Sequence, residues 1–321
     1  MNTAYIDKKE KESVLNQNPV VEGPIPSAFC RQESGAMDYL QIHLFRNIKW
    51  LTHVKIPFKI DFESVVSELI LQHAKNYFIV GCNYSNYRYL EERGYKGIRM
   101  GREAILDLKF NHFRKRSLKE LVRRGKKHGI INEVPYSTTA AQDMQEFRKF
   151  SRHGNEPQLR YLFNTYFEDN NRLFVIKNPD GLWLGAILLS YKSDKYVQSE
   201  AILCRKNAPV GIMEALIYEI FKKLRSEGNE YWTLGAVPFT IYGSSFLSKE
   251  YVINVTGRFM KFAYNYRGLF NFKNKFNPIW ADYYICIRPF FDPGAMIGIL
   301  IKSNLLKLGI YKFLHFGIKK S

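Results

Sequence analysis

The sequence predicts an α/β protein made of two tandem units, each with a mixed central sheet flanked by helices. Three observations predict this fold. Strand-like and helix-like apolar stretches alternate between residues 36 and 135. Between residues 136 and 290, two helices precede the order strand, strand, strand, loop, helix, strand, helix, strand. Hydrophobic residues are 46% and aromatic residues 15% of the 321 residues, enough to form substantial cores.

The first unit follows a polar stretch, residues 1–35, which we expect to be a loose arm. Residues 39–58 predict two short strands. A helix is expected over residues 61–75, where apolar side chains recur at helical spacing behind Asp61 as the cap. The remaining elements are a strand, a helix closed by Gly94 and a strand, over residues 77–80, 84–93 and 104–108.

Residues 109–127 predict a strongly basic helix, with nine basic residues and one acid, Glu120. Leu118, Leu121 and Val122 give it a narrow apolar stripe. Because almost no acids compensate the charge, we expect it to bind phosphate groups, and a solvated helix face is the alternative. The expected phosphate-binding residues are Arg114, Lys115, Arg116, Arg123, Arg124, Lys126 and Lys127.

The second unit gives the clearest pattern. Proline and glycine in Asn178–Gly181 predict a tight turn between two strands, since proline sets φ and glycine accepts positive φ. The apolar stripe of residues 212–225 predicts a well-buried helix. The other expected elements are helices over 138–151, 156–169 and 259–266 and strands over 172–177, 182–191, 196–204, 231–234 and 281–287.

This order of elements is that of the fold typified by the GCN5-related N-acetyltransferases, and the first half shows a similar late portion. We therefore predict a degenerate first acyltransferase-like domain at residues 36–135 and a second one at 136–290. In acetyl-CoA-using members of this fold, a glycine-rich loop before the main helix holds pyrophosphate. Here that loop contains Pro209 and a single glycine, Gly211, which favours a different activated acyl donor.

Charge and cysteine content limit the possible partners. The chain has 48 Lys and Arg against 30 Asp and Glu, a formal net charge of +18, which favours nucleic acid or an anionic membrane surface. The four cysteines are far apart and suggest reduced cytosolic thiols. The histidines show no metal-ligand spacing, and we expect neither a metal nor a cofactor. No signal peptide and no ordinary transmembrane helix are expected, since no run of about 18 apolar residues occurs.

The tail, residues 291–321, predicts a basic apolar helix. From Pro293 onward it has five lysines and no acid. The lysines at 302, 307 and 312 do not share one helix face, so amphipathicity is imperfect. Such a helix can lie on an anionic membrane or pack on the domain, and both alternatives stay open.

The segment Asn271–Trp280 is basic, aromatic and too irregular for a plain helix face. It is part of a longer stretch, Tyr264–Trp280. Together with Leu234–Phe239, Gly101–Leu108 with the basic helix after it, and Arg205–Glu214, this stretch resembles the C-terminal catalytic domain of the phosphatidylglycerol lysyltransferases, or aminoacyl-phosphatidylglycerol synthases. The resemblance runs from about residue 36 to 290 in the same order. It implies tandem acyltransferase-like domains that move an amino acid from aminoacyl-tRNA to the glycerol hydroxyl of phosphatidylglycerol, at the cytosolic membrane face.

Two departures from the family pattern matter. Its enzymes usually carry a large N-terminal transmembrane region, which is not expected in this chain. The family also has an Asp three residues ahead of an Arg, where this chain has Glu200 and Leu203. The acceptor therefore stays open between a lipid and a small soluble amine. Two rival functions also stay open, a CoA-dependent N-acyltransferase and a non-catalytic tRNA- or membrane-binding module.

The resemblance also suggests site residues. Lys275 is the candidate cation near a phosphate or the developing oxyanion, with a surface lysine as the alternative. Glu200 is the candidate for binding the donor's α-ammonium or acting as base, and Arg205 for holding phosphate or orienting Glu200. The candidate substrate-binding residues are Gly235, Pro238, Asn277 and Trp280.

Overall fold

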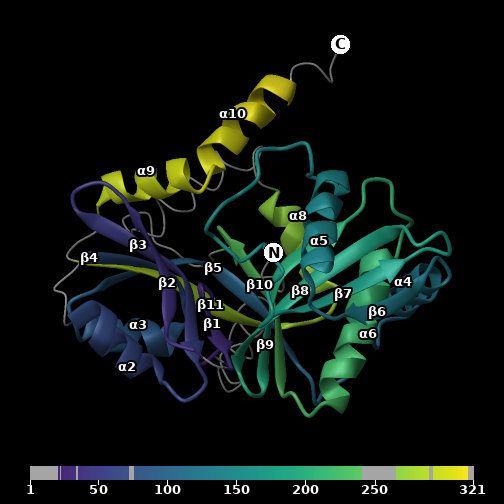
Figure 1. The fold of residues 1–321 in the computed structure, drawn as a ribbon, viewed down its shortest axis with the longest axis horizontal. Coiled ribbons are helices and arrows are strands. Elements are labelled where there is room, and N and C mark those ends of the chain that lie inside the picture. Colours follow the sequence, from purple (N-terminus) through teal and green to yellow (C-terminus); the bar gives the residue numbers. More distant parts are fainter. Residues whose placement is uncertain are drawn as a thin grey trace, which may run out of the picture.

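A computed structural model describes residues 21, 23–33, 35–71, 76–240, 265–288 and 292–316. Its centre is a mixed sheet that is eleven-stranded within this part of the chain, with helices on its faces and along one edge (Figure 1). The strand order is β1-β3-β4-β11-β5-β10-β9-β8-β7-β6, and β2 pairs with β3. The α/β fold class with a mixed sheet flanked by helices is therefore confirmed.

The first half forms mainly as expected. Its elements are β1 (Phe29–Gln32), β2 (Asp38–His43), β3 (Ile48–Pro57), α2 (Phe62–Val66) with a π-helical turn (Ser67–Leu71), β4 (Asn76–Cys82), α3 (Tyr84–Glu91) and β5 (Lys96–Asp107). The expectation that residues 1–35 form only a loose arm is wrong for β1. Phe29 is buried and pairs with Val54 in a parallel ladder, because the few apolar residues of this polar stretch complete the sheet edge.

The elements after β5 are α4 (Arg116–Lys126), β6 (Ile130–Val134), α5 (Thr138–Phe150), β7 (Arg172–Lys177), β8 (Trp183–Ser193), β9 (Tyr196–Cys204), α6 (Ile212–Ser226), β10 (Tyr231–Pro238), α8 (Tyr266–Asn274) and β11 (Ile279–Ile287). From β7 on, the second half follows the predicted order. α4 and β6 lie within residues 36–135, the range predicted for the first unit, but β6 pairs with β7 of the second. The tight turn between β7 and β8 is confirmed, with Gly181 at a φ of +79° and its amide donating to the Asn178 carbonyl. Strand β6 was not predicted.

Three predicted conformations are wrong. Residues 109–115 of the predicted basic helix are not helical, since α4 begins only at Arg116. Residues 156–169 are not helical. Leu162 packs into one core and Phe167 into another, so the segment has no single buried face, and the positive φ of Tyr161 interrupts any helix. Conversely, the supposedly irregular stretch from Asn271 is helical as far as Asn274, as the end of α8. Of the helix expected at 259–266, residues 259–264 lie outside the described part of the chain.

The last strand of each half lies in the sheet of the other half. β11 is antiparallel to both β4 and β5, and β5 in turn is antiparallel to β10. β11 was expected to close the second unit, but it fills the place between two strands of the first. The two halves share one continuous sheet, and their division into two domains stays a prediction.

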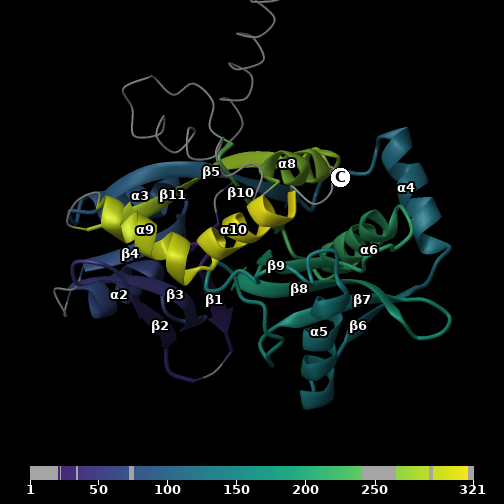
Figure 2. The ribbon, with the colours of Figure 1, turned by 90° about the horizontal axis from the view of Figure 1, so that it is seen from above.

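The tail forms two helices instead of the single one expected, α9 (Pro293–Lys302) and α10 (Leu305–Phe316). Both helices lie outside the sheet. α9 lies at the opposite end of the molecule's long axis from α4 (Figures 1 and 2). Within the described residues, no single helix has the length and apolarity to cross a membrane. Only α9 and α10 taken together meet that test, and they are bent by 66°.

Candidate functional site

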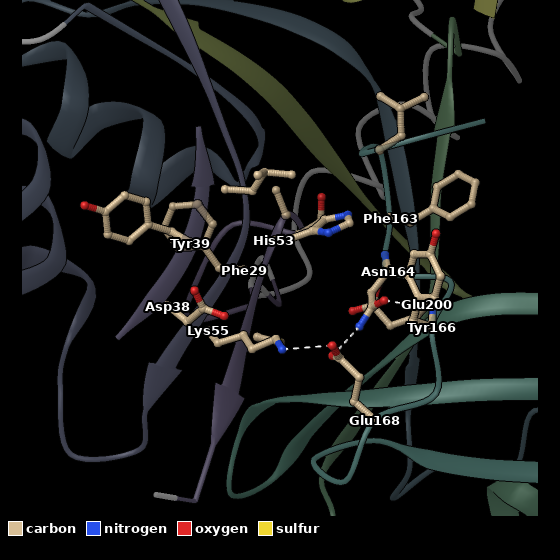
Figure 3. A pocket seen from close by; sticks show the side chains of 15 residues that line it. Phe29, Asp38, Tyr39, His53, Lys55, Phe163, Asn164, Tyr166, Glu168 and Glu200 are labelled. Carbon is tan, nitrogen blue, oxygen red and sulfur yellow. Dashed lines mark hydrogen bonds and ion pairs between the residues drawn. The ribbon is translucent and has the colours of Figure 1, made fainter. Parts of the chain in front are cut away.

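A cavity of about 230 Å³ opens between the first half of the sheet and the segment that joins α5 to β7 (Figure 3). Side chains from β1, β2 and β3 form one wall, residues 162–168 form the other, and Glu200 of β9 completes it. Lys55 and Glu168 form an ion pair across the two walls at 3.0 Å. The cavity is thus lined by charged groups from segments far apart in the sequence.

Glu200, a predicted site residue, is buried in this cavity and hydrogen-bonded through both carboxylate oxygens. Its Oε1 accepts hydrogen bonds from Ser190 Oγ at 2.6 Å and Gln198 Nε2 at 2.9 Å. Its Oε2 accepts one from the Asn164 amide at 3.1 Å. These three donors fix the orientation of the carboxylate, and each oxygen retains lone-pair capacity for a cation in the cavity.

His53 is a cavity residue that sequence reasoning missed. It lies within β3, where the register against β2 shifts, and has a φ of +50°, a conformation that a non-glycine residue rarely adopts. Its Nε2 is buried and has no hydrogen-bond partner. Burial lowers the pKa of the imidazole, although the charge of Glu200 opposes that shift. A neutral imidazole with an unpaired buried nitrogen is available to a ligand. No sequence motif marks His53, because its only signal is its backbone conformation.

A row of buried charges leads from the cavity across the sheet. Lys192 is buried and donates to the main-chain carbonyls of Pro26, Ser27 and Phe29. Burial lowers the pKa of Lys192, whereas the charges of Glu200 and Glu103 raise it. Since an isolated buried charge is costly, these groups stabilise one another electrostatically.

Lys273 lies at the far end of this row. Its Nζ is buried and donates to the carbonyl oxygens of Gly235 at 2.8 Å and Ala236 at 3.1 Å. Burial lowers the pKa of Lys273 to about 7, and the charge of Glu103 opposes that shift. Glu103 accepts a hydrogen bond from Thr233 Oγ1 at 2.9 Å, and burial raises the pKa of its carboxyl group. Such a poised amine is typical of a site for proton transfer.

The backbone at Gly235 gives Lys273 its acceptors. β10 runs parallel to β9 for only three residue pairs, Tyr231–Thr233 against Tyr196–Gln198. Beyond this point β10 has an irregular register against β5, and Gly235 has a φ of +86°. The Gly235 amide donates to Thr233 Oγ1, and the Gly235 carbonyl oxygen accepts from Lys273. The predicted site residue Gly235 therefore lies where the two parallel strands separate.

Lys275 lies two residues farther along, on the other side of α8. Its Nζ forms an ion pair at 2.8 Å with Glu214, a buried residue in the first turn of α6. The neighbouring Phe276 is fully buried and anchors the end of the helix. The structure thus brings Lys273, but not Lys275, to Gly235, and a catalytic role for Lys275 stays a prediction.

The other predicted residues from this region have mainly structural contacts. Asn277 has a φ of +49°, and its carbonyl oxygen lies 3.2 Å from His112 Nδ1. Trp280 stacks on Phe270 with ring centroids 4.6 Å apart. Pro238 ends β10 and pairs with Gly101. These contacts hold the turn between α8 and β11 in place.

Arg205 is not brought to Glu200. Its Nε donates to the Trp183 carbonyl at 2.7 Å, and its guanidinium lies 5.1 Å from the centre of the Phe150 ring. It also pairs through its backbone with Ser151 at the end of α5. These contacts give Arg205 a role in fixing α5 against β8, and its predicted roles in phosphate binding and in orienting Glu200 stay untested.

Helix α4 covers the start of α6, where a phosphate-binding loop is found in CoA-dependent members of the predicted fold. A Cβ added to Gly125 would lie 2.1 Å from the Gly211 carbonyl oxygen. One added to Gly211 would lie 2.2 Å from the Leu121 carbonyl oxygen. Only glycine allows this close approach, so α4 packs directly against the start of α6.

The outer side of α4 is strongly basic. Arg123 pairs with Glu120, and Lys126 pairs with Glu219. The other predicted phosphate-binding residues are exposed and form no ion pair within the described residues: Arg114, Lys115, Arg116, Arg124 and Lys127. Among the residues that the structure describes, no group of three or more His, Cys, Asp or Glu side chains is placed to hold a metal ion.

Comparisons with known proteins agree with this architecture. Residues 57–287 match the family model described as phosphatidylglycerol lysyltransferase, C-terminal. A phosphatidylglycerol lysyltransferase from Bacillus subtilis (strain 168) is 24% identical over 208 residues, which are 61% of this chain and 24% of that protein. The chain therefore spans about a quarter of the length of this relative.

Two solved structures share the fold. The structure of L-PGS from Bacillus licheniformis has a TM-score of 0.64 and 17% identity, covering 82% of this chain and 84% of that one. The C-terminal domain of a putative lysylphosphatidylglycerol synthetase from Agrobacterium fabrum has a TM-score of 0.60 and 19% identity, covering 84% and 85%. At these identities the comparison concerns the fold alone.

Proposed function

Because this chain belongs to the phosphatidylglycerol lysyltransferase C-terminal family, we propose that it is an aminoacyltransferase that moves an amino acid from aminoacyl-tRNA to a hydroxyl of phosphatidylglycerol. One observation carries the proposal. The buried charges from Glu200 to Lys273 connect a cavity of amino-acid size with a poised amine at the point where β9 and β10 separate.

The cavity suits the aminoacyl group. Glu200, held by three donors, provides a buried negative charge for the α-ammonium. His53 Nε2 provides an unpaired polar atom beside it. Both groups position the donor, and positioning is the main requirement for an ester that is already activated.

Lys273, whose lowered pKa suits proton transfer, is the proposed general base. It lies outside the residues that line the cavity, so the ester of the bound donor must extend from the cavity to the Gly235 turn. A neutral amine has two N–H groups and one lone pair, and Lys273 already directs donors to the carbonyls of Gly235 and Ala236. Its lone pair is then free to take the proton of the acceptor hydroxyl as that oxygen attacks the ester carbonyl carbon. When the tetrahedral intermediate breaks its bond to the tRNA ribose oxygen, the Lys273 ammonium returns the proton to that oxygen. One ester is exchanged for another, so no further reactant is needed.

The direct test uses the purified chain with total tRNA charged with labelled amino acids and vesicles that contain phosphatidylglycerol. We expect an aminoacylated lipid by mass spectrometry and no product after RNase treatment. Transfer to a soluble amine alone would move the acceptor away from lipid. Consumption of acetyl-CoA without any transfer from tRNA would refute the proposal.

Replacing Glu200 with glutamine is expected to lower kcat/KM for transfer by about tenfold to a hundredfold, because a hydrogen-bonded charge for the α-ammonium is removed. The main change is expected in KM for aminoacyl-tRNA. Glu63→Gln is the matched control, since Glu63 is exposed in the first turn of α2, outside the residues that line the cavity. Equal kinetics for Glu200→Gln and the control would remove Glu200 from the site.

Replacing Arg124 and Lys127 with glutamine is expected to weaken tRNA binding and to reduce the slope of log affinity against log salt by roughly one unit for each phosphate that is no longer neutralised. Filter binding at several salt concentrations measures both quantities. Lys59, in the turn after β3, and Lys96, at the start of β5, are exposed and lie outside α4, so Lys59→Gln with Lys96→Gln removes the same charge elsewhere. If both double variants change the slope equally, α4 is not the specific tRNA-binding surface.

A further inference from the structure

The exposed side of α9 and α10 is apolar and basic, which neither core packing nor the site explains. On α10, Leu306, Ile310 and Leu314 recur at helical spacing, and each is at least 44% exposed. On α9, Ile297 and Ile301 are also exposed and one turn apart. Exposed apolar side chains that gather on two neighbouring helices of an otherwise charged protein mark a contact site.

The positive charge of these helices indicates an anionic partner. Lys302 and Lys307 are exposed beside the apolar stripe, and neither forms an ion pair among the described residues. From Pro293 to Phe316 there is no acidic residue. Apolar side chains flanked by lysines suit the boundary between headgroups and acyl chains of an anionic bilayer.

The same helices hold the cavity wall. At their junction, the Ser303 carbonyl accepts a hydrogen bond from the Arg160 amide at 3.1 Å. Asn304 Nδ2 donates to the Gln158 carbonyl at 2.9 Å, and Lys312 of α10 pairs with Glu156. The segment fixed in this way continues directly into residues 162–168, which line the cavity.

We infer that α9 and α10 lie on an anionic bilayer through the stripe of Ile297, Ile301, Leu306, Ile310 and Leu314, and that this contact orders the cavity wall next to them. The inference deepens the proposed function, because it names the surface that presents the lipid acceptor. α4 lies at the other end of the molecule from α9 (Figures 1 and 2), so tRNA and membrane can be bound together.

Vesicle sedimentation of the full chain, without tRNA, tests the docking. We expect binding to phosphatidylcholine vesicles that contain phosphatidylglycerol, and at least about tenfold weaker binding to phosphatidylcholine alone. Ile310→Glu is expected to weaken binding to the anionic vesicles by about tenfold or more. Leu182→Glu is the matched control, since Leu182 is similarly exposed (45% against 54%) in the turn between β7 and β8.

Charge removal gives a second measurement. Lys302→Gln and Lys307→Gln are each expected to reduce binding to anionic vesicles by about fivefold. Equal binding of Ile310→Glu and wild type, or a wild-type dimer that becomes monomeric in Ile310→Glu, would overturn the inference. The second result would assign the stripe to another copy of the chain.

Amide hydrogen exchange tests the link to the cavity. On addition of anionic vesicles, the amides of residues 158–168 are expected to exchange more slowly in the wild type. In Ile310→Glu, their exchange rates are expected to stay unchanged. Unchanged exchange in the wild type would refute the link. Since neither measurement requires turnover, a chain that binds vesicles but transfers no amino acid would refute the proposed function and leave the docking surface in place.

Discussion

Replacing Lys273 with methionine is expected to lower kcat for aminoacyl transfer by about 10²–10⁴-fold, because the reaction loses its general base. Methionine has a similar length and no charge, so it fits the buried site. Single-turnover transfer from charged tRNA to phosphatidylglycerol vesicles measures the loss without interference from product release.

The pH dependence gives a separate signature of Lys273. With its pKa lowered to about 7 by burial, wild-type kcat is expected to rise with pH through about 7 and then level off. The unfolded chain keeps this proton up to its usual pKa of 10.5, so it binds more protons than the native state between about pH 7 and 10.5. Wild-type stability in urea should therefore gain from this group as pH rises across that window, and Lys273→Met should lose that gain.

Lys275→Met is the matched control, and it also tests the sequence-based choice of lysine. It leaves the buried carboxylate of Glu214 without its partner, so we expect lower stability and a less than tenfold change in kcat. We therefore expect a large loss of kcat in Lys273→Met, and mainly a loss of stability in Lys275→Met. A large loss of kcat in Lys275→Met with near-normal Lys273→Met would assign the chemistry to Lys275.

Replacing Gly211 with alanine is expected to lower the free energy of unfolding by about 3 kcal/mol. Roughly 1–2 kcal/mol comes from holding a Cβ-bearing residue in the left-handed region, at a φ of +99°. About 1–3 kcal/mol more comes from overlap with the backbone of α4, since the new Cβ would lie 2.2 Å from the Leu121 carbonyl oxygen. Urea denaturation measures the sum, and tRNA affinity is expected to fall as α4 is displaced.

Gly94→Ala separates the two causes. Gly94 has a similar φ of +81°, and no other atom lies within 4 Å of its Cβ position. This variant should therefore lose only the conformational part, about 1–2 kcal/mol. Equal losses in Gly211→Ala and Gly94→Ala would mean that α4 does not press on the start of α6.

Local signals predicted the elements whose folding depends on local rules. Proline and glycine at Asn178–Gly181 are sufficient to specify a turn, and the apolar stripe after Gly211 is sufficient to specify α6. The segment 156–169 shows where such signals fail. Its apolar residues are spaced as in a helix, but they are divided between two cores, and spacing alone cannot reveal that division.

The candidate site was only partly predictable for a related reason. Glu200 was predicted as a site residue from its position in the family pattern, and in the structure it lines the cavity. Lys273 and Lys275 lie in the same basic stretch, and the sequence does not show which of the two is buried; in the structure it is Lys273. His53 has a positive φ, and no neighbouring residue type in the sequence indicates that conformation.

The crossing of β5 and β11 into opposite halves sets the order in which a growing chain can fold. The edge of β4 at Cys82 meets its partner only at Tyr284, about 200 residues later. At typical synthesis rates of about 5–20 residues per second, that edge stays open for roughly 10–40 s on the ribosome. An unpaired strand edge invites aggregation, so nascent chains that stop before β11 should depend on chaperones far more than the finished protein.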